Sequence, residues 1–394
     1  MICRFHKVSI ICISIILYFS DSIGCQYNVR DIGFADILTR PYQLYFYIQE
    51  DTPDTLVSIF KQISNATFVG YNIEVEIINK SHDKENQALE YYYFWDINSI
   101  PAVILQSPTG RSMIIPISDN YISFKETVWS SLEWIALSPV REEILNNIVK
   151  SYAVILLVEG ENKRENNKVY DLVLKVKKEI SKVMDQMPKR IDEPPHIIVI
   201  SQEIIPDEKI LLWSLDLDEE VGKEPAIVFL FGRGRRFGPI LRRGEISQSK
   251  LLQILSLIGL SCECGLDLTL SIGSPILSRW GEQEQRQVVQ YLGIDVENPM
   301  IKMEMANILS LNRSSQAKDI IRDFDDVLEG YSEEIIKSNQ RSSAARVSPS
   351  QMQDLDSAGS NSIFSYSLYV MSFLALLAFA GGGYVLFRAG RKKP

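Results

Sequence analysis

Two stretches of the chain repeat the same order of apolar and polar residues. Residues 101–117 (PAVILQSPTGRSMIIPI) and 225–241 (PAIVFLFGRGRRFGPIL) each contain an apolar run, a glycine-containing turn and a second apolar run. They align without a gap, with Pro101 opposite Pro225. Short apolar runs joined by such a turn are typical of β-hairpins. The chain is therefore predicted to use one α/β unit twice.

The segments around each hairpin follow a common order. In the first half the pattern predicts strands at 29–37, 43–49 and 72–78, and helices at 53–63, 84–96 and 121–137. In the second half it predicts helices at 142–150, 168–184 and 246–260, strands at 152–158 and 196–201, and an apolar stretch at 209–217. We expect an α/β fold with two domains, residues 25–139 and 140–261.

The sequence that follows these two domains is shorter and more polar. Residues 262–312 contain two helical patterns, 282–292 and 298–309, and predict a helical appendix with a Cys-x-Cys pair. Residues 313–362 are rich in Ser, Asp and Gln and predict a stalk or linker.

The N-terminal end has the features of a secretory signal. Residues 1–24 contain basic residues, an apolar run at 8–19 and then small residues. Cleavage after Gly24 would make Cys25 the first residue. The residues before Cys25 also resemble a bacterial lipobox, although Ser22 departs from it, so a plain cleaved signal and lipidation of Cys25 both stay open.

The C-terminal end predicts a single membrane anchor. Residues 363–387 carry no charge and would span about 37 Å as a helix, enough to cross a bilayer. The basic tail 388–394 is then expected on the cytoplasmic side. The rest of the chain would be exported, to the periplasm in bacteria. The alternative is the endoplasmic reticulum membrane, because the last four residues, RKKP, loosely resemble a dilysine retrieval tail.

The composition of the chain argues against some classes of function. The chain is 46% hydrophobic and 23% charged, which is sufficient for globular cores, and its net charge of −9 argues against a nucleic-acid binder. The three histidines lie far apart, so no His-rich metal site is expected. No motif for a cofactor or a catalytic triad occurs, and we predict neither metal nor cofactor.

The order of elements, with a proline opening each hairpin, resembles the thioredoxin fold. The resemblance covers about 230 residues as two copies. It implies that Pro101 and Pro225 occupy the position of the family's cis-proline, beside a surface that can present itself to extended peptides. The loops where the family carries Cys-x-x-Cys read QEDTP at 49–53 and EGEN at 159–162, and neither contains a cysteine. Thiol exchange needs an attacking and a resolving sulfur, so neither copy can perform it there.

Two other groups could carry chemistry. Cys262 and Cys264 form the only closely spaced thiol pair; they could make a disulfide, act as a redox couple or bind a soft metal. With the Arg-Trp and Asn-Pro-Met segments that follow, the pair is also similar to uncharacterised secreted bacterial membrane proteins. Arg233, Arg235 and Arg236 lie in the second hairpin, where they predict either a solvated tip or a docking patch for an acidic partner or headgroups.

Other conspicuous residues receive structural interpretations. Alternate residues of the aromatic run 91–95 are expected to pack on the sheet, as aromatic residues at a helix end usually do, and Asp216 is expected to be solvated. The sequence thus predicts a membrane-anchored extracytoplasmic binding or scaffold protein, with a chaperone-like or assembly role and a protein or peptide partner. The alternative is a thiol–disulfide oxidoreductase or metal-handling protein that uses Cys262 and Cys264, so enzymatic activity stays open.

Overall fold

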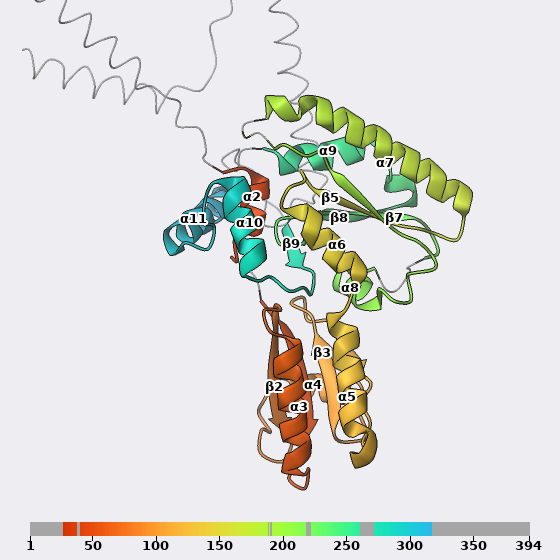
Figure 1. Cartoon of the computed structure of the whole chain (residues 1–394), viewed down its shortest axis with the longest axis vertical. Helices are drawn as coiled ribbons and strands as arrows, with labels where there is room; N and C mark the ends of the chain where they lie inside the picture. Colours follow the sequence, from red (N-terminus) through yellow and green to blue (C-terminus); the bar gives the residue numbers. More distant parts are fainter. Residues whose placement is uncertain are drawn as a thin grey trace, which may run out of the picture. The chain divides into compact units, whose positions relative to one another are not determined.

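The computed structural model describes residues 27–37, 40–187, 189, 191–217, 222–260 and 272–316, all within one compact unit, Met1–Ile335. These residues form a mixed α/β structure with two sheets (Figure 1). None of the helices in these ranges has the length and apolarity that a bilayer crossing requires. The predicted signal, Cys25, the Cys262–Cys264 pair, nearly all of the stalk and the predicted anchor at 363–387 lie outside the described residues.

The first lobe, residues 40–137, is built on a four-stranded sheet. Its order is β2-β1-β3-β4; β1 and β2 are parallel, and β3 is antiparallel to β1 and β4. Helices α3 and α5 pack together and form one hydrophobic core with the sheet. The short α4 forms a second core with the same sheet. β4 is left as an edge strand. The bounds are β1 Tyr42–Ile48, α3 Asp54–Thr67, β2 Ile73–Asn79, α4 Leu89–Phe94, β3 Ala102–Gln106, β4 Ser112–Ile115 and α5 Tyr121–Ala136.

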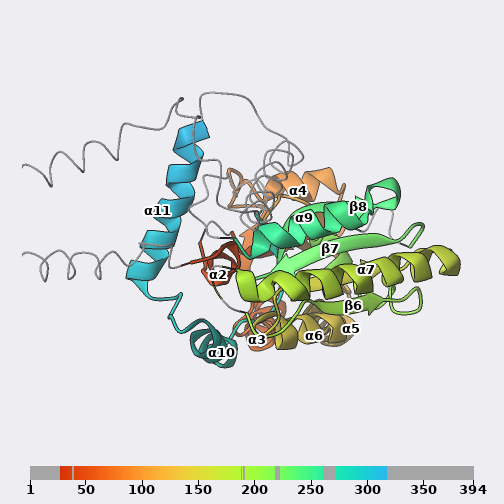
Figure 2. The same cartoon turned by 90° about the horizontal axis from the view of Figure 1, so that it is seen from above.

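The second lobe, comprising the other described residues, has a five-stranded sheet of order β6-β5-β7-β8-β9. Helices α7 and α9 lie side by side along it (Figure 2). β9 was not predicted, and it joins part of the expected helical appendix to this sheet. The bounds are α6 Pro139–Ile148, β5 Val154–Val158, α7 Lys163–Val183, η1 Met184–Gln186, β6 His196–Ile200, α8 Lys209–Ser214, β7 Ala226–Phe231, β8 Arg235–Arg242, η2 Arg243–Glu245, α9 Gln248–Ile258, β9 Ile272–Pro275, α10 Glu282–Leu292 and α11 Pro299–Gln316.

The two sheets repeat one pairing scheme, as the sequence repeat predicts. The central strand, β1 or β5, pairs in parallel with the next strand and antiparallel with the first hairpin strand. Pro101 directly precedes β3 and Pro225 directly precedes β7. The Ile100–Pro101 bond is the cis peptide among the described residues, so Glu224–Pro225 is trans. The two prolines head equivalent strands but differ in geometry.

The predicted first strand at 29–37 is wrong. Residues Val29–Phe34 form a helix, α2, because Asn28 and Asp31 make a reciprocal capping box. The Asn28 Oδ1 accepts from the Asp31 N–H at 2.8 Å, and the Asp31 carboxylate accepts from the Asn28 N–H at 3.2 Å. All six residues of α2 are buried, and they pack against β7 and α9 in the second lobe. The N-terminal segment therefore completes the second core.

Helix lengths differ from prediction where side chains cap or interrupt the backbone. α4 begins at Leu89 rather than residue 84, because Asp83 and Asn86 accept main-chain N–H bonds in the turns before it. α7 begins at Lys163 rather than residue 168, because the Asn162 carboxamide accepts from the N–H groups of the first turn. α10 has the predicted bounds, and α11 extends beyond its predicted end.

The segment after β9 and helix α8 join the lobes. The Asn72 side chain donates to the Ile276 carbonyl and accepts from the Ser278 N–H, both at 2.9 Å. Helix α8 is shared, because its Trp213 packs in the first core and its Leu211 in the second. These contacts fix the first lobe on the second within this unit.

Candidate functional site

The two loops that the sequence resemblance places at redox positions differ in packing. In the first, the Gln49 N–H donates to Thr52 Oγ1 at 3.0 Å, and the loop is exposed. In the second, the Asn166 carboxamide bonds both the N–H and the carbonyl of Gly160, at 2.9 and 2.8 Å. A Cβ at position 160 would lie 2.7 Å from the backbone before Pro225. The second loop is therefore closed against the proline, and neither loop holds a sulfur.

Both hairpin prolines are buried. The cis-proline surface that the resemblance implies would therefore consist of the exposed groups around Pro101, among them the acidic Glu50 and Asp51 of the neighbouring loop. Binding at Pro101 and Pro225 stays a prediction.

The hairpin arginines serve internal contacts rather than a solvated tip or an open docking patch. Arg235 is 4% exposed and donates to the Ile37 carbonyl at 2.8 Å. Arg233 donates to the Phe34 carbonyl at 2.8 Å and is paired with Glu297. Burial lowers the pKa of Arg235 to about 10 and also lowers the pKa of Arg233. These guanidinium groups hold the N-terminal segment in place.

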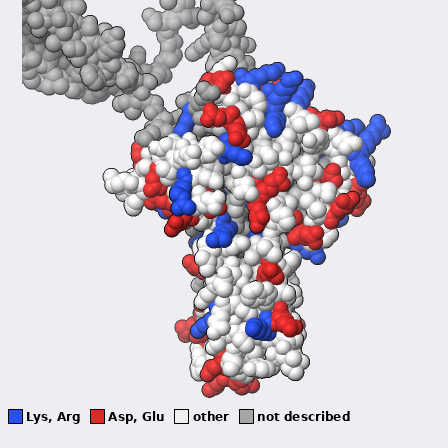
Figure 3. All heavy atoms as spheres, in the orientation of Figure 1, with Lys and Arg blue, Asp and Glu red and all other residues white. Residues whose placement is uncertain are grey.

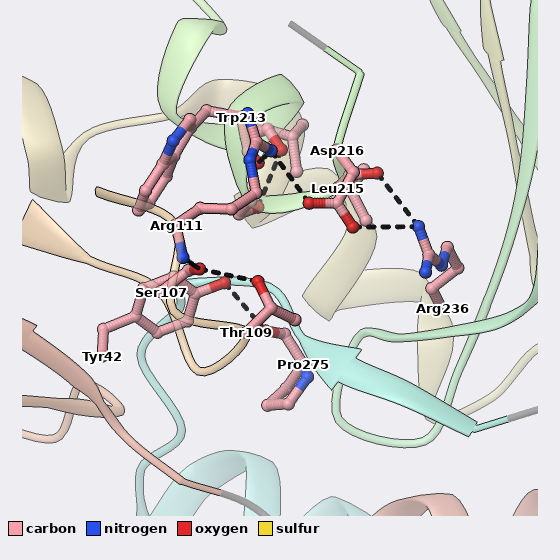
Figure 4. A network of polar contacts seen from close by, with 11 residues as sticks. Tyr42, Ser107, Thr109, Arg111, Trp213, Leu215, Asp216, Arg236 and Pro275 are labelled. Atoms are coloured by element: carbon pink, nitrogen blue, oxygen red, sulfur yellow. Dashed lines mark hydrogen bonds and ion pairs between the residues drawn. The ribbon is translucent and has the colours of Figure 1, made fainter. Parts of the chain in front are cut away.

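Arg236 takes part in a polar network that crosses between the lobes (Figure 4). The Asp216 carboxylate accepts from Arg111 Nη1 at 2.8 Å and from Arg236 Nη1 at 3.2 Å. The same Arg111 nitrogen donates to the Trp213 carbonyl at 2.9 Å. The sequence predicted a solvated Asp216; instead it joins the first hairpin turn to β8, with its backbone at φ 62°. The network fixes one wall of a groove.

This groove, the aromatic groove, has a volume of about 580 Å³, within the usual range for ligand sites. It lies where the end of α4, the β3–β4 turn and α8 meet. It is lined by Glu90, Tyr91, Phe94, Trp95, Gly110, Arg111, Ser112, Met113 and Trp213.

The aromatic run beside the groove is more exposed than the predicted alternate packing on the sheet would make it. Tyr92 is buried, but Tyr93 and Phe94 are 66% and 76% exposed, and Trp95 is 37% exposed. α4 spans only six residues and cannot bury every ring. Trp95 is oriented by its indole N–H, which donates to Ser112 Oγ at 2.9 Å. Exposed aromatic side chains that gather at a groove are typical of interaction sites.

The buried Tyr45 supports Tyr91, which lines the groove. Tyr45 of β1 stacks on Tyr91 with ring centroids 6.0 Å apart, and its hydroxyl donates to Gln106 Oε1 at 2.7 Å. Burial raises the pKa of Tyr45 to about 12, so the hydroxyl stays protonated at physiological pH. The floor of the groove is therefore fixed by packing and hydrogen bonds.

Strand β4 borders the groove and offers a free edge. Among the strands that the structure describes it pairs with β3 alone, and its Ile114 is 43% exposed. The unpaired side of an edge strand presents main-chain N–H and carbonyl groups to any extended chain. The groove and β4 together can accept an extended backbone and apolar side chains. Nothing in the sequence pattern singled out this site, because α8 lies about 100 residues beyond α4 and the hairpin turn.

No cluster of three or more His, Cys, Asp or Glu that could hold a metal occurs within the described ranges. Cys262 and Cys264 fall outside them, so their pairing stays a prediction.

Comparison with known proteins returns only distant structural likenesses. No family model matches the chain, and no curated protein matches it. The first two thioredoxin domains of Saccharomyces cerevisiae Eps1p share 9% identity over 55% of this chain and 91% of theirs, with a TM-score of 0.20. Those of Naumovozyma dairenensis Eps1p share 11% over 60% and 97%, with a TM-score of 0.20. Zinc-bound human ERp44 shares 9% over 61% and 58%, with a TM-score of 0.21. Scores this low assign neither family nor function.

Proposed function

We propose that this chain is a membrane-anchored extracytoplasmic binding protein that captures extended peptide segments. The observation that carries the proposal is the aromatic groove beside the free edge of β4, with its wall fixed by Asp216 and its exposed rings at Phe94 and Trp95. Catalysis by thiol exchange at the usual loops is not supported, since both loops lack cysteine.

Strand addition explains why an extended peptide suits this site. A peptide that pairs with the open edge of β4 gains main-chain hydrogen bonds along the strand. Its alternate side chains then point to the same face of the sheet. On the α4 face this places them against Ile114 and the rings of Phe94 and Trp95. The backbone provides affinity for any sequence, and the rings favour apolar or aromatic side chains.

The membrane anchor and the compartment form part of the proposal. They are supported by the signal-like residues 1–24 and the uncharged residues 363–387. The binding lobes would face the periplasm or the lumen of the endoplasmic reticulum, with the basic tail in the cytoplasm.

We expect Trp95→Ala to weaken peptide binding about tenfold, because an aromatic residue at the centre of a binding site often contributes more than 1 kcal/mol. The probe is a fluorescein-labelled ten-residue peptide of alternating Phe and Thr, titrated against the full chain in detergent by fluorescence anisotropy. Trp129→Ala is the matched control, since Trp129 is 53% exposed on α5, away from the groove lining.

A second peptide with N-methyl groups at every other residue tests the strand pairing. It keeps the side chains but cannot form a continuous ladder with β4, and we expect it to bind at least tenfold more weakly. Equal binding of both peptides, or equal loss in Trp95→Ala and Trp129→Ala, would contradict the proposed site. Loss of binding after alkylation of Cys262 and Cys264 would instead favour the thiol alternative.

A further inference from the structure

Helix α7 carries an excess of basic side chains on its exposed face. Its 21 residues contain seven Lys and Arg against three Asp and Glu, an excess of four positive charges in a chain of net charge −9. Figure 3 shows Lys and Arg side chains over the region where Figure 1 draws α7. Helix α7 thus presents a group of exposed basic side chains, whereas Arg233 and Arg235 of the second hairpin are engaged in internal contacts.

The basic residues share the outward face of α7. Val173, Val176 and Ile180 point into the second core. With 3.6 residues per turn, the opposite side presents a basic stripe, and Asp171 is the acidic residue within it. The stripe consists of Arg164, Lys168, Lys175, Lys178 and Lys182, all exposed.

These charges have no partner within the part of the chain that the structure describes. The ion pairs found there include neither Lys168 nor Lys175, Lys178 or Lys182. A basic stripe that served only stability would be expected to alternate with acids at i+4 spacing, and α7 has few of them.

Apolar side chains flank the stripe on the same solvent-facing side. Tyr170 is 39% exposed and Leu174 is 41% exposed, one turn apart. Lysines beside an exposed tyrosine and leucine match the composition of helices that lie in the headgroup layer of a membrane. An acidic protein partner would satisfy the lysines but would not account for these apolar neighbours as directly.

We propose that the outward face of α7 binds the anionic headgroups of a lipid bilayer, and that Tyr170 and Leu174 enter its interfacial layer. The inference rests on the proposed membrane anchor for its location, because tethering would hold α7 at high concentration near the same surface. Binding would be electrostatic in part and sensitive to salt.

The test uses the full chain and vesicles of phosphatidylcholine, with or without 30% phosphatidylglycerol. Flotation with the neutral vesicles reports the anchor. A membrane-impermeant amine reagent and mass spectrometry then report the accessibility of each lysine. We expect labelling of Lys168, Lys175, Lys178 and Lys182 to fall at least threefold in the anionic vesicles, and to recover in 0.5 M NaCl.

Lys61 and Lys125 are the internal controls, because both are exposed lysines on helices of the first lobe. Their labelling should not change. Equal labelling of α7 in both vesicles, or an equal fall at the control lysines, would overturn the proposal. If the chain floats only with anionic vesicles and α7 is protected, the anchor fails but the α7 surface stands. If it floats with neither, both fail.

Discussion

We expect Gly232→Ala to lower the free energy of unfolding by about 4 kcal/mol, an exceptional value for the addition of one methyl group. Gly232 lies in the β7–β8 turn at φ 56°, in the left-handed region that favours glycine. A Cβ there would lie 2.1 Å from the carbonyl carbon and oxygen of Gly33. Both atoms are backbone, so the clash can be relieved only by moving α2 and the β7–β8 turn apart.

Displacement of α2 would break hydrogen bonds to the second hairpin as well as the packing of α2 itself. The Arg233 N–H donates to the Gly33 carbonyl at 3.0 Å, and the Arg235 guanidinium depends on carbonyls that follow α2. Urea denaturation of the full chain in detergent measures the effect. Gly244→Ala is the control, because a Cβ there meets no atom within 4 Å and its φ is not positive. Similar stabilities for the two variants would show that α2 does not pack on the second lobe as described.

We expect Arg141→Met to cost about 3 kcal/mol. Arg141 is 3% exposed, and its guanidinium donates to the Leu277 and Ile135 carbonyls at 2.6 Å each. It also caps the end of α5 through the carbonyls of Ala136 and Leu137. Methionine keeps most of the volume but leaves these buried acceptors unpaired, and each unpaired acceptor costs about 1–3 kcal/mol.

Because Leu277 belongs to the segment that joins the lobes, the loss at Arg141 should also loosen the first lobe. Limited proteolysis is therefore expected to cut Arg141→Met between the lobes at lower protease concentrations than the parent chain. Arg286→Met serves as the control, since Arg286 is exposed and its ion pair among the described residues is an i,i+4 pair with Glu282, worth a few tenths of a kcal/mol. An unchanged cleavage pattern in Arg141→Met would argue that the guanidinium does not hold the two lobes together.

The repeated architecture was predictable because it depends on local patterns. The two hairpins, the helix after each and the bounds of α10 follow from apolar periodicity and turn residues. The placement of 29–37 was missed because the apolar pattern of a short buried helix resembles that of a strand. The signal for a helix was present in the spacing of Asn28 and Asp31.

The aromatic groove could not be predicted, because it depends on tertiary placement. Alternate residues of the aromatic run were predicted to pack on the sheet. Only Tyr92 of this run is buried, because α4 is short. The hairpin arginines were predicted to lie at the surface, yet Arg233 and Arg235 bind main-chain carbonyls of a segment about 200 residues away. The charge or hydrophobicity of a residue indicates whether it needs a polar partner or a buried position. It does not indicate which distant segment supplies that partner or covers that residue.

Hydrogen–deuterium exchange of the full chain, with and without the Phe–Thr peptide, tests the proposed mode of binding most directly. Pairing along the open edge would slow exchange at the outward amides of β4, residues Ser112–Ile115, and would leave the loop at 49–53 unchanged. Protection of the 49–53 loop and the amides next to Pro101, with none in β4, would contradict the groove and place binding at the cis-proline surface instead.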